Sequence, residues 1–268
     1  MSMPRSQAVT IVISRDGRGV AGDRAGFEDA LADTLRRKTG SELLVVPHLY
    51  HLRVSHPAAA ALMEAPGDLA VASWLHPRAA FWTLRALGVG GAAASAPNAS
   101  QARAIRCLNL ADFESVAECA RALAAESAAG RAAALKEIAD AATPRWYPVI
   151  DYSRCTGCRK CMDFCLFGVY ALSGGNVVVS NPDNCKNGCP ACARTCPERA
   201  IIFPHYFADA AIAGSSPPAV AAELRRAGAE TPSRSETSRP APQGGARAEY
   251  APPDDLDHLI NALEKLDE

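Results

Sequence analysis

The sequence lacks several features that would assign a function directly. It has no run of 18 uninterrupted apolar residues, the length expected of a membrane-spanning helix. The motifs G-x-S-x-G, H-E-x-x-H and the P-loop are also absent. The net charge at pH 7 is only −1, which gives no electrostatic indication of nucleic acid or of an anionic membrane. No catalytic residue is therefore assigned, and the function must be sought in local sites.

The first residues, MSMPRSQAVTIVIS, have neither the charged-then-apolar order of a signal peptide nor a twin-arginine start. We therefore expect a cytoplasmic protein. A length of 268 residues is enough for one or two domains with buried cores.

Cysteine is almost absent outside one short region. Eight of the ten cysteines lie within residues 155–196, and only Cys107 and Cys119 lie elsewhere. A disulfide framework distributes its bridges over a small domain, so this clustering favours metal ligation. We expect Cys107 and Cys119 to be small buried hydrophobic residues.

Residues 1–143 alternate between strand and helix patterns. Strands are predicted at 8–14, 42–47, 68–74 and 104–110, with helices between them and one or two closing helices within 112–142. This order predicts an α/β domain with a mostly parallel, doubly wound sheet.

The rest of the chain divides into three parts. The cysteine-rich region, residues 146–206, is expected to form a second, small α+β domain. Residues 214–253 have the composition of a disordered linker. Residues 254–268, DDLDHLINALEKLDE, place their aliphatic side chains on one face of a predicted amphipathic helix.

The cysteine region is an internal repeat of about 30 residues. CTGCRKCMDFC, residues 155–165, is followed by CKNGCPACARTC, residues 185–196, with one extra residue in the first gap. Structural zinc is usually held by two CxxC pairs around one ion. Here each repeat has three closely spaced thiols and a fourth three residues later, which is the ligand run of two [4Fe–4S] clusters.

On these motifs, residues 146–206 resemble the bacterial-type two-cluster ferredoxins. The resemblance implies a low-potential electron carrier in which the fourth thiol of each repeat ligates the other cluster. Each cluster then takes three ligands from one repeat and the fourth from the other: Cys155, Cys158, Cys161 and Cys196 for the first, and Cys185, Cys189, Cys192 and Cys165 for the second.

Two departures from the family pattern bear on these sites. Leu166 stands where the family usually has proline after the fourth cysteine, and the longer gap after Cys185 leaves a three-iron second cluster as an alternative. A pair of zinc sites, or a cluster that serves only to hold the fold together, would also use clustered thiols.

The N-terminal domain has two weaker candidate sites. GRGVAG, residues 17–22, matches a dinucleotide-binding loop but lacks the acidic residue at the end of the second strand. His48, His51 and His56 follow that strand and His76 follows the next, at the edge where α/β sheets bind ligands.

This histidine pattern is loosely similar to the small cobalamin and siroheme chelatases, and it implies a metal or tetrapyrrole site. Their first-strand histidine is replaced here by Ser14 and Arg15. Ordinary loop and capping histidines are the alternative. Trp74, Phe81 and Trp82 are expected to be core or interface aromatic residues.

The sequence thus predicts an iron–sulfur protein that relays single electrons to or from a partner oxidoreductase, with residues 254–268 as a candidate docking helix. No nucleic acid and no membrane insertion are expected. Two alternatives remain: an oxidoreductase or chelatase-like enzyme with its active site in the α/β domain, and a non-catalytic, cluster-bearing assembly subunit.

Overall fold

The computed structural model describes residues 8–17, 23–96, 102–125, 134–139 and 141–215, which all belong to one compact unit. The predicted linker, apart from Gly214 and Ser215, and the predicted C-terminal helix lie outside the described residues. So does most of the GRGVAG loop. Within the described ranges, no helix is both long enough and apolar enough to cross a membrane.

The first half of the chain forms a six-stranded sheet in which every pair of neighbouring strands is parallel. Its strand order is β4-β5-β3-β1-β2-β6. The strands are β1 (Val9–Ser14), β2 (Glu42–Val46), β3 (Asp68–Ser73), β4 (Ala92–Ala93), β5 (Ala104–Asn109) and β6 (Leu135–Glu137). The prediction of an α/β fold with a mostly parallel sheet is confirmed.

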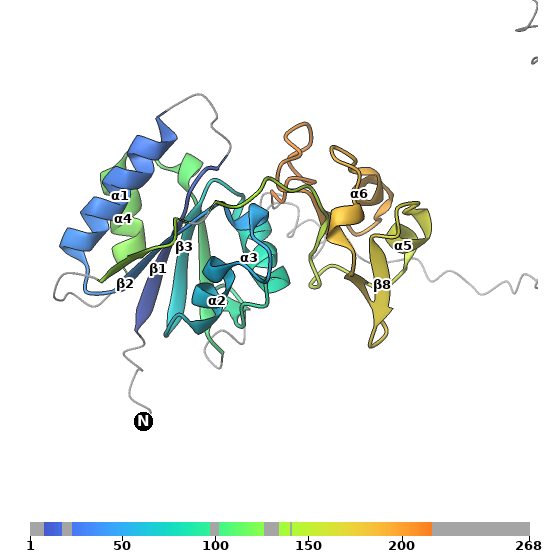
Figure 1. The fold of residues 1–268 in the computed structure, drawn as a ribbon, viewed down its shortest axis with the longest axis horizontal. Helices are drawn as coiled ribbons and strands as arrows, with labels where there is room; N and C mark the ends of the chain where they lie inside the picture. Colours follow the sequence, from blue (N-terminus) through green and yellow to red (C-terminus); the bar gives the residue numbers. More distant parts are fainter. Residues whose placement is uncertain (1–7, 18–22, 97–101, 126–133, 140, 216–268) are drawn as a thin grey trace, which may run out of the picture. The chain divides into compact units, whose positions relative to one another are not determined.

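Helices cover both faces of this sheet (Figure 1). Leu35 on one face packs in the same cluster as Ile11, and Leu84 on the other packs in the same cluster as Val12. Successive strand residues point to opposite faces, which is why the β-branched run of β1 is buried along its whole length. One face carries α1 (Arg24–Lys38) and α4 (Val116–Ala124), and the other α2 (Pro57–Glu64) and α3 (Pro77–Ala86).

The prediction of only helices within 112–142 is wrong for residues 135–137. Helix α4 ends at Ala124, and Leu135–Glu137 form β6 beside β2. The alanine-rich composition favours helix locally, but the edge of β2 offers unpaired backbone groups to this segment. Hydrogen bonds from Leu43 N to Ala134 O (3.0 Å) and from Ile138 N to Val45 O (2.9 Å) extend the pairing.

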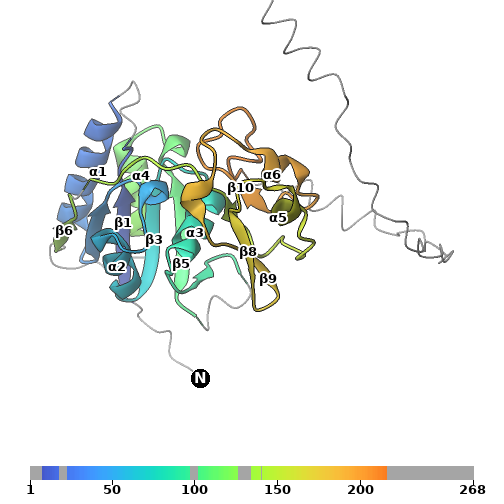
Figure 2. The same cartoon turned by 45° about the vertical axis from the view of Figure 1, so that its right-hand side comes forward.

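The cysteine-rich segment folds as two similar halves, each a strand, a short helix and a strand (Figure 2). The first strand pairs with the last, β7 with β10, and the two middle strands pair as a hairpin, all antiparallel. The elements are β7 (Val149–Ile150), α5 (Lys160–Phe164), β8 (Tyr170–Ser173), β9 (Asn176–Val179), α6 (Ala191–Thr195) and β10 (Ile201–Ile202). The described ranges also contain short 3-10 turns: η1 (Leu49–His51) and η2 (Leu110–Asp112) in the α/β half, and η3 (Pro182–Asn184) in the cysteine-rich segment.

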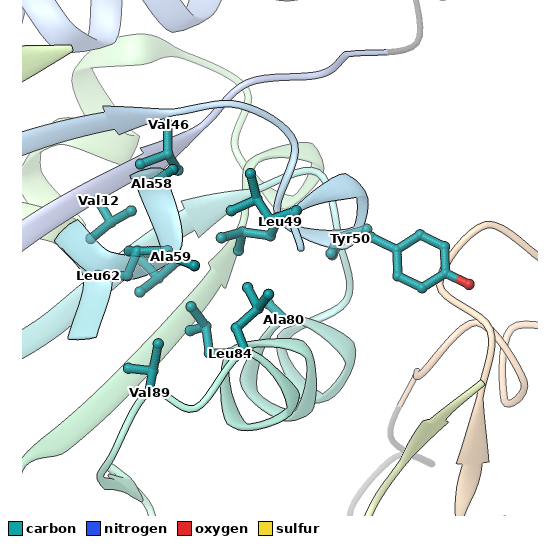
Figure 3. Close-up of a cluster of buried hydrophobic side chains, with 14 of the residues drawn as sticks. Val12, Val46, Leu49, Tyr50, Ala58, Ala59, Leu62, Ala80, Leu84 and Val89 are labelled. Atoms are coloured by element: carbon teal, nitrogen blue, oxygen red, sulfur yellow. The ribbon is translucent and has the colours of Figure 1, made fainter. Parts of the chain in front are cut away.

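The two halves of the chain share one hydrophobic cluster. Tyr147, Val149 and Ile202 pack within the cluster of α2 and α3. Tyr50 belongs to the same cluster, but Figure 3 shows its side chain pointing away from the other labelled residues. Its hydroxyl donates to Tyr147 O (2.5 Å) and accepts from Tyr147 N (2.7 Å), so it satisfies both backbone groups of one buried residue.

Candidate metal centre

The eight clustered cysteines lie around two separate cavities. Each cavity is lined by three cysteines of one repeat and the fourth cysteine of the other. The first is lined by Cys155, Cys158, Cys161 and Cys196, and the second, of about 370 Å³, by Cys185, Cys189, Cys192 and Cys165. The resemblance to two-cluster ferredoxins implies the same two groups of four, and their role as ligands stays a prediction. Cys185 lines the second cavity despite the longer gap before Cys189.

The local backbone explains how each repeat gathers its thiols. Gly157 (φ +71°) and Gly188 (φ +75°) occupy matching positions before the second cysteine of each repeat. Both adopt the left-handed conformation that glycine accepts without strain, so the loop can turn back on itself. Short helices α5 and α6 then carry the third cysteine, and the fourth follows directly after each helix at Cys165 and Cys196.

The thiols have few polar partners, and all but the exposed Cys158 are partly or fully buried. Burial, with neighbouring thiols, raises the pKa of Cys185 to about 12, and burial raises the pKa of Cys161 and Cys192 to about 11. Without a cation, such thiols keep their protons at neutral pH, whereas a bound metal stabilises the thiolate form. Four cysteines around one cavity, with no histidine in its lining, suit an iron–sulfur cluster or zinc.

Two hydrogen bonds reach the sulfur atoms from outside the cysteine loops. Tyr170 Oη donates to Cys192 Sγ (3.1 Å), and Ala200 N donates to Cys196 Sγ (3.3 Å). Burial, reinforced by the neighbouring Cys192, raises the pKa of Tyr170 far above its ordinary value, so this hydroxyl remains a donor. Donors of this kind adjust the reduction potential of an iron–sulfur cluster.

The second cavity lies beside exposed apolar side chains. Phe164, Leu166 and Phe167 line it, and Leu166 is 94% exposed. Leu166 stands where a proline was expected from the family pattern, and its side chain extends into solvent. The second group of thiols is therefore close to the protein surface.

Comparisons with known proteins bear on the cysteine-rich segment. A family model described as "4Fe-4S binding domain" matches residues 147–170. A ferredoxin of Methanothermococcus thermolithotrophicus is 39% identical over 54 residues, which cover 88% of that protein and 19% of this chain. The chain belongs to the ferredoxin family. This membership supports an iron–sulfur electron-transfer role with [4Fe–4S] chemistry.

Two further ferredoxins are similar to this chain over matches of comparable length. Ferredoxin-3 of a Nostoc species is 34% identical over 74 residues, which cover 75% of that protein and 21% of this chain. An uncharacterized ferredoxin of Methanocaldococcus jannaschii is 53% identical over 60 residues, but this chain spans only 41% of its length. These matches cover about a fifth of the present chain, and the matched family model lies within its cysteine-rich segment.

The histidines of the α/β half separate into two kinds. His56 and His76 are the N-cap residues of α2 and α3, and His56 Nδ1 accepts from Ala58 N (3.1 Å). His48 and His51 instead lie together with His205, which comes from the ferredoxin segment. No sequence pattern links His205 to His48, because 157 positions separate them.

The remaining candidates have structural surroundings. Arg15 forms ion pairs with Asp29 and Glu137 (both 2.8 Å), so it holds β1 to neighbouring elements. Burial raises the pKa of both Cys107 and Cys119 to about 12, as expected for unreactive thiols. The three predicted core aromatic residues pack against the two hydrophobic clusters of the α/β half: Trp74, Phe81 and Trp82.

Proposed function

We propose that this protein relays single electrons through two [4Fe–4S] clusters, to or from a partner oxidoreductase. The observation that carries the proposal is the crossed grouping of the thiols, with Cys196 beside the first repeat's cysteines and Cys165 beside the second's. A structural zinc site needs no such exchange between repeats, whereas neighbouring clusters in two-cluster ferredoxins use it.

The residues around each thiol group have separable roles in this proposal. The thiolates would hold the iron, and the clusters would supply one-electron chemistry. Tyr170 and Ala200 donate hydrogen bonds to ligand sulfurs and so favour the more negative state. Ile150, Val177 and Ile201 pack around the cysteines and limit the access of water.

Protection of individual thiols tests the crossed ligation. Anaerobically purified protein should contain about eight iron atoms, four per cluster. Cys165→Ser should lower this to about four, and alkylation followed by mass spectrometry should find Cys185, Cys189 and Cys192 newly reactive. The first group should stay protected, and Cys196→Ser should give the opposite pattern.

Cys119→Ser is the matched control, because Cys119 lies in α4 outside both groups. It should change neither the iron content nor the alkylation pattern. If Cys165→Ser exposes Cys155, Cys158 and Cys161 instead, the ligand assignment is wrong. Zinc in place of iron in the wild-type protein would end the electron-transfer proposal.

A partner has two points of contact in this proposal. The first is the exposed apolar surface of Phe164, Leu166 and Phe167, which line the cavity of the second thiol group. An electron would be exchanged with the partner there. The predicted helix at 254–268 would hold the same partner nearby through the linker, which raises its effective concentration.

A second candidate is an oxidoreductase whose active site lies in the α/β half and is reduced internally. The position of Cys185 favours this candidate, because its side chain packs against the hydrophobic core of the ferredoxin segment and also against that of the α/β half. An electron on the second cluster would therefore lie close to the α/β half. Equilibrium dialysis of the cluster-bearing protein with FMN, NAD⁺ or a tetrapyrrole would test this. Binding near one equivalent would favour the enzyme, and no binding would favour the simple carrier.

A further inference from the structure

Three histidines converge at the carboxyl edge of the parallel sheet. His48 and His51 follow β2 and are buried, at 2% and 3% exposure, whereas His205 follows β10 and is half-buried. One ring nitrogen from each lies within 4.8 Å of the other two. This group is separate from both sets of cysteines.

The backbone around β2 brings the first two rings together. His48 caps η1 and His51 ends it, and side chains three residues apart lie on the same side of a 3-10 turn. Their rings stack with centroids 4.4 Å apart. His205 then contacts both rings edge-on, with centroid distances of 4.8 Å to His48 and 5.1 Å to His51.

Contacts outside the group hold these rings in place. Ser14 Oγ, at the end of β1, accepts from Leu49 N (3.0 Å) and so ties η1 to the sheet. Tyr50, between the two histidines, is bonded to both backbone groups of Tyr147. The His205 ring lies edge-on to Tyr50, with centroids 4.9 Å apart. Such support is what a preorganised ligand set requires.

The spacing of the nitrogens suits a metal ion. Metal–nitrogen bonds of about 2.0–2.1 Å at a tetrahedral angle place two ligand nitrogens roughly 3.3–3.4 Å apart. His48 Nε2 and His205 Nε2 are 3.3 Å apart. A hydrogen bond between these two nitrogens has a similar length, but it does not require the third ring, His51, to converge on the same point. A ring nitrogen of His51 lies within 4.8 Å of one nitrogen on each of the other two rings, so a side-chain rotation can bring it toward the same point.

We propose that His48, His51 and His205 bind one divalent first-row transition-metal ion, separate from the cysteine-bound iron. Imidazole nitrogen is a preferred ligand of Zn²⁺, Cu²⁺, Ni²⁺ and Fe²⁺. Three neutral imidazoles complete three positions of a tetrahedron and leave the fourth to water or another small ligand. The ion would also join the α/β half to the ferredoxin segment, because its ligands come from both.

Cobalt(II) is a suitable probe, since it accepts the same geometry as zinc and is paramagnetic. It is added to the oxidised, anaerobic, cluster-bearing protein, in which [4Fe–4S]²⁺ is diamagnetic and does not obscure the cobalt EPR signal. We expect one tightly bound Co²⁺ per chain, no loss of iron, and a higher thermal unfolding midpoint. Zn²⁺ should displace the cobalt signal.

Single substitutions identify the ligands. His51→Ala and His205→Gln should each weaken cobalt binding at least about 100-fold, given that even outer contacts change metal affinity 10–100-fold. His205→Gln guards against misfolding because this residue is only half-buried. His76→Ala is the matched control, since His76 caps α3 without a side-chain hydrogen bond there.

The outcomes separate this proposal from the electron-transfer proposal. Loss of cobalt binding in both ligand variants, with iron content and His76→Ala unchanged, supports the histidine site. The proposal is overturned if the wild-type protein binds no cobalt, if the ligand variants bind it equally well, or if cobalt enters only as iron leaves. Iron content and thiol protection test the clusters independently of all these results.

Discussion

Arg78 and Asp151 form the most deeply buried ion pair that joins the two halves among the described residues. Arg78 Nε lies 2.5 Å from Asp151 Oδ2, and the two side chains are 7% and 2% exposed. Arg78 also donates to Arg199 O (2.7 Å). Asp151 holds the turn before the first thiol group, because its backbone oxygen accepts from Cys155 N (3.0 Å). Removal of Arg78 should therefore affect both stability and the first cysteine group.

We expect Arg78→Met to destabilise the protein by about 3 kcal/mol. Leaving one partner of a buried ion pair uncompensated typically costs about 3–5 kcal/mol. The lower end applies because Arg154, 3.5 Å from Asp151, is half-buried and compensates in part. For a unit of this size, 1 kcal/mol corresponds to roughly 2–4 °C, so the thermal unfolding midpoint should fall by about 6–12 °C.

The assay is thermal unfolding of the anaerobic, cluster-bearing protein, followed by circular dichroism and by cluster absorbance. The matched control is Arg85→Met, on the same helix, because Arg85 donates to Val89 O within the α/β half (2.8 Å). It should cost about 1 kcal/mol. Addition of Asp151→Asn to Arg78→Met removes the stranded charge, so the double variant should regain at least about 1 kcal/mol.

Thiol alkylation gives a second readout of the same variant. Cys155 and its group should become reactive at a lower temperature than the second group in Arg78→Met. The reasoning is refuted if Arg78→Met lowers the midpoint no more than Arg85→Met. It is equally refuted if the double variant is less stable than Arg78→Met alone, since the stranded charge would then not be the cause.

Three further predictions concern different parts of the chain. Tyr170→Phe removes the hydrogen-bond donor to Cys192 and should lower the reduction potential of one cluster by about 50 mV, close to a tenfold change in a one-electron equilibrium constant. The control is Tyr152→Phe, which should leave the potential unchanged because the Tyr152 hydroxyl donates to a backbone carbonyl. Equal shifts in the two variants would contradict the prediction. Burial raises the pKa of Glu28 above 4.5, so the wild-type free energy of unfolding should fall as pH rises through that raised pKa. Glu28→Gln should then gain stability over wild type at pH 7 but not at pH 4.5 in urea unfolding; a loss at pH 7 would mean that the ion pair with Arg15 outweighs burial. Deletion of residues 254–268 should leave the iron content and the thermal unfolding midpoint unchanged but slow electron transfer at low partner concentration. A lower midpoint with unchanged transfer kinetics would instead indicate that the predicted helix packs against its own chain.

The sequence by itself determined the features that depend on local spacing. Alternating strand and helix patterns predicted the parallel sheet, because apolar periodicity reflects which side of each element is buried. The spacing of Cys161 and Cys165 predicted a fourth thiol displaced along a short helix, and in the structure Cys161 lies in α5 while Cys165 directly follows it. The burial of Cys119 followed from its place in an apolar helical pattern.

Further features were decided only by tertiary structure. Residues 135–137 have a composition typical of helix, yet they pair with β2 because that strand's edge was open. His56 resembles His48 and His51 in the sequence, but it caps α2, while His205 joins the other two from 157 positions beyond His48. Local spacing carries no information about contacts at such separations, which arise only when the two halves of the chain pack through Tyr50 and Tyr147.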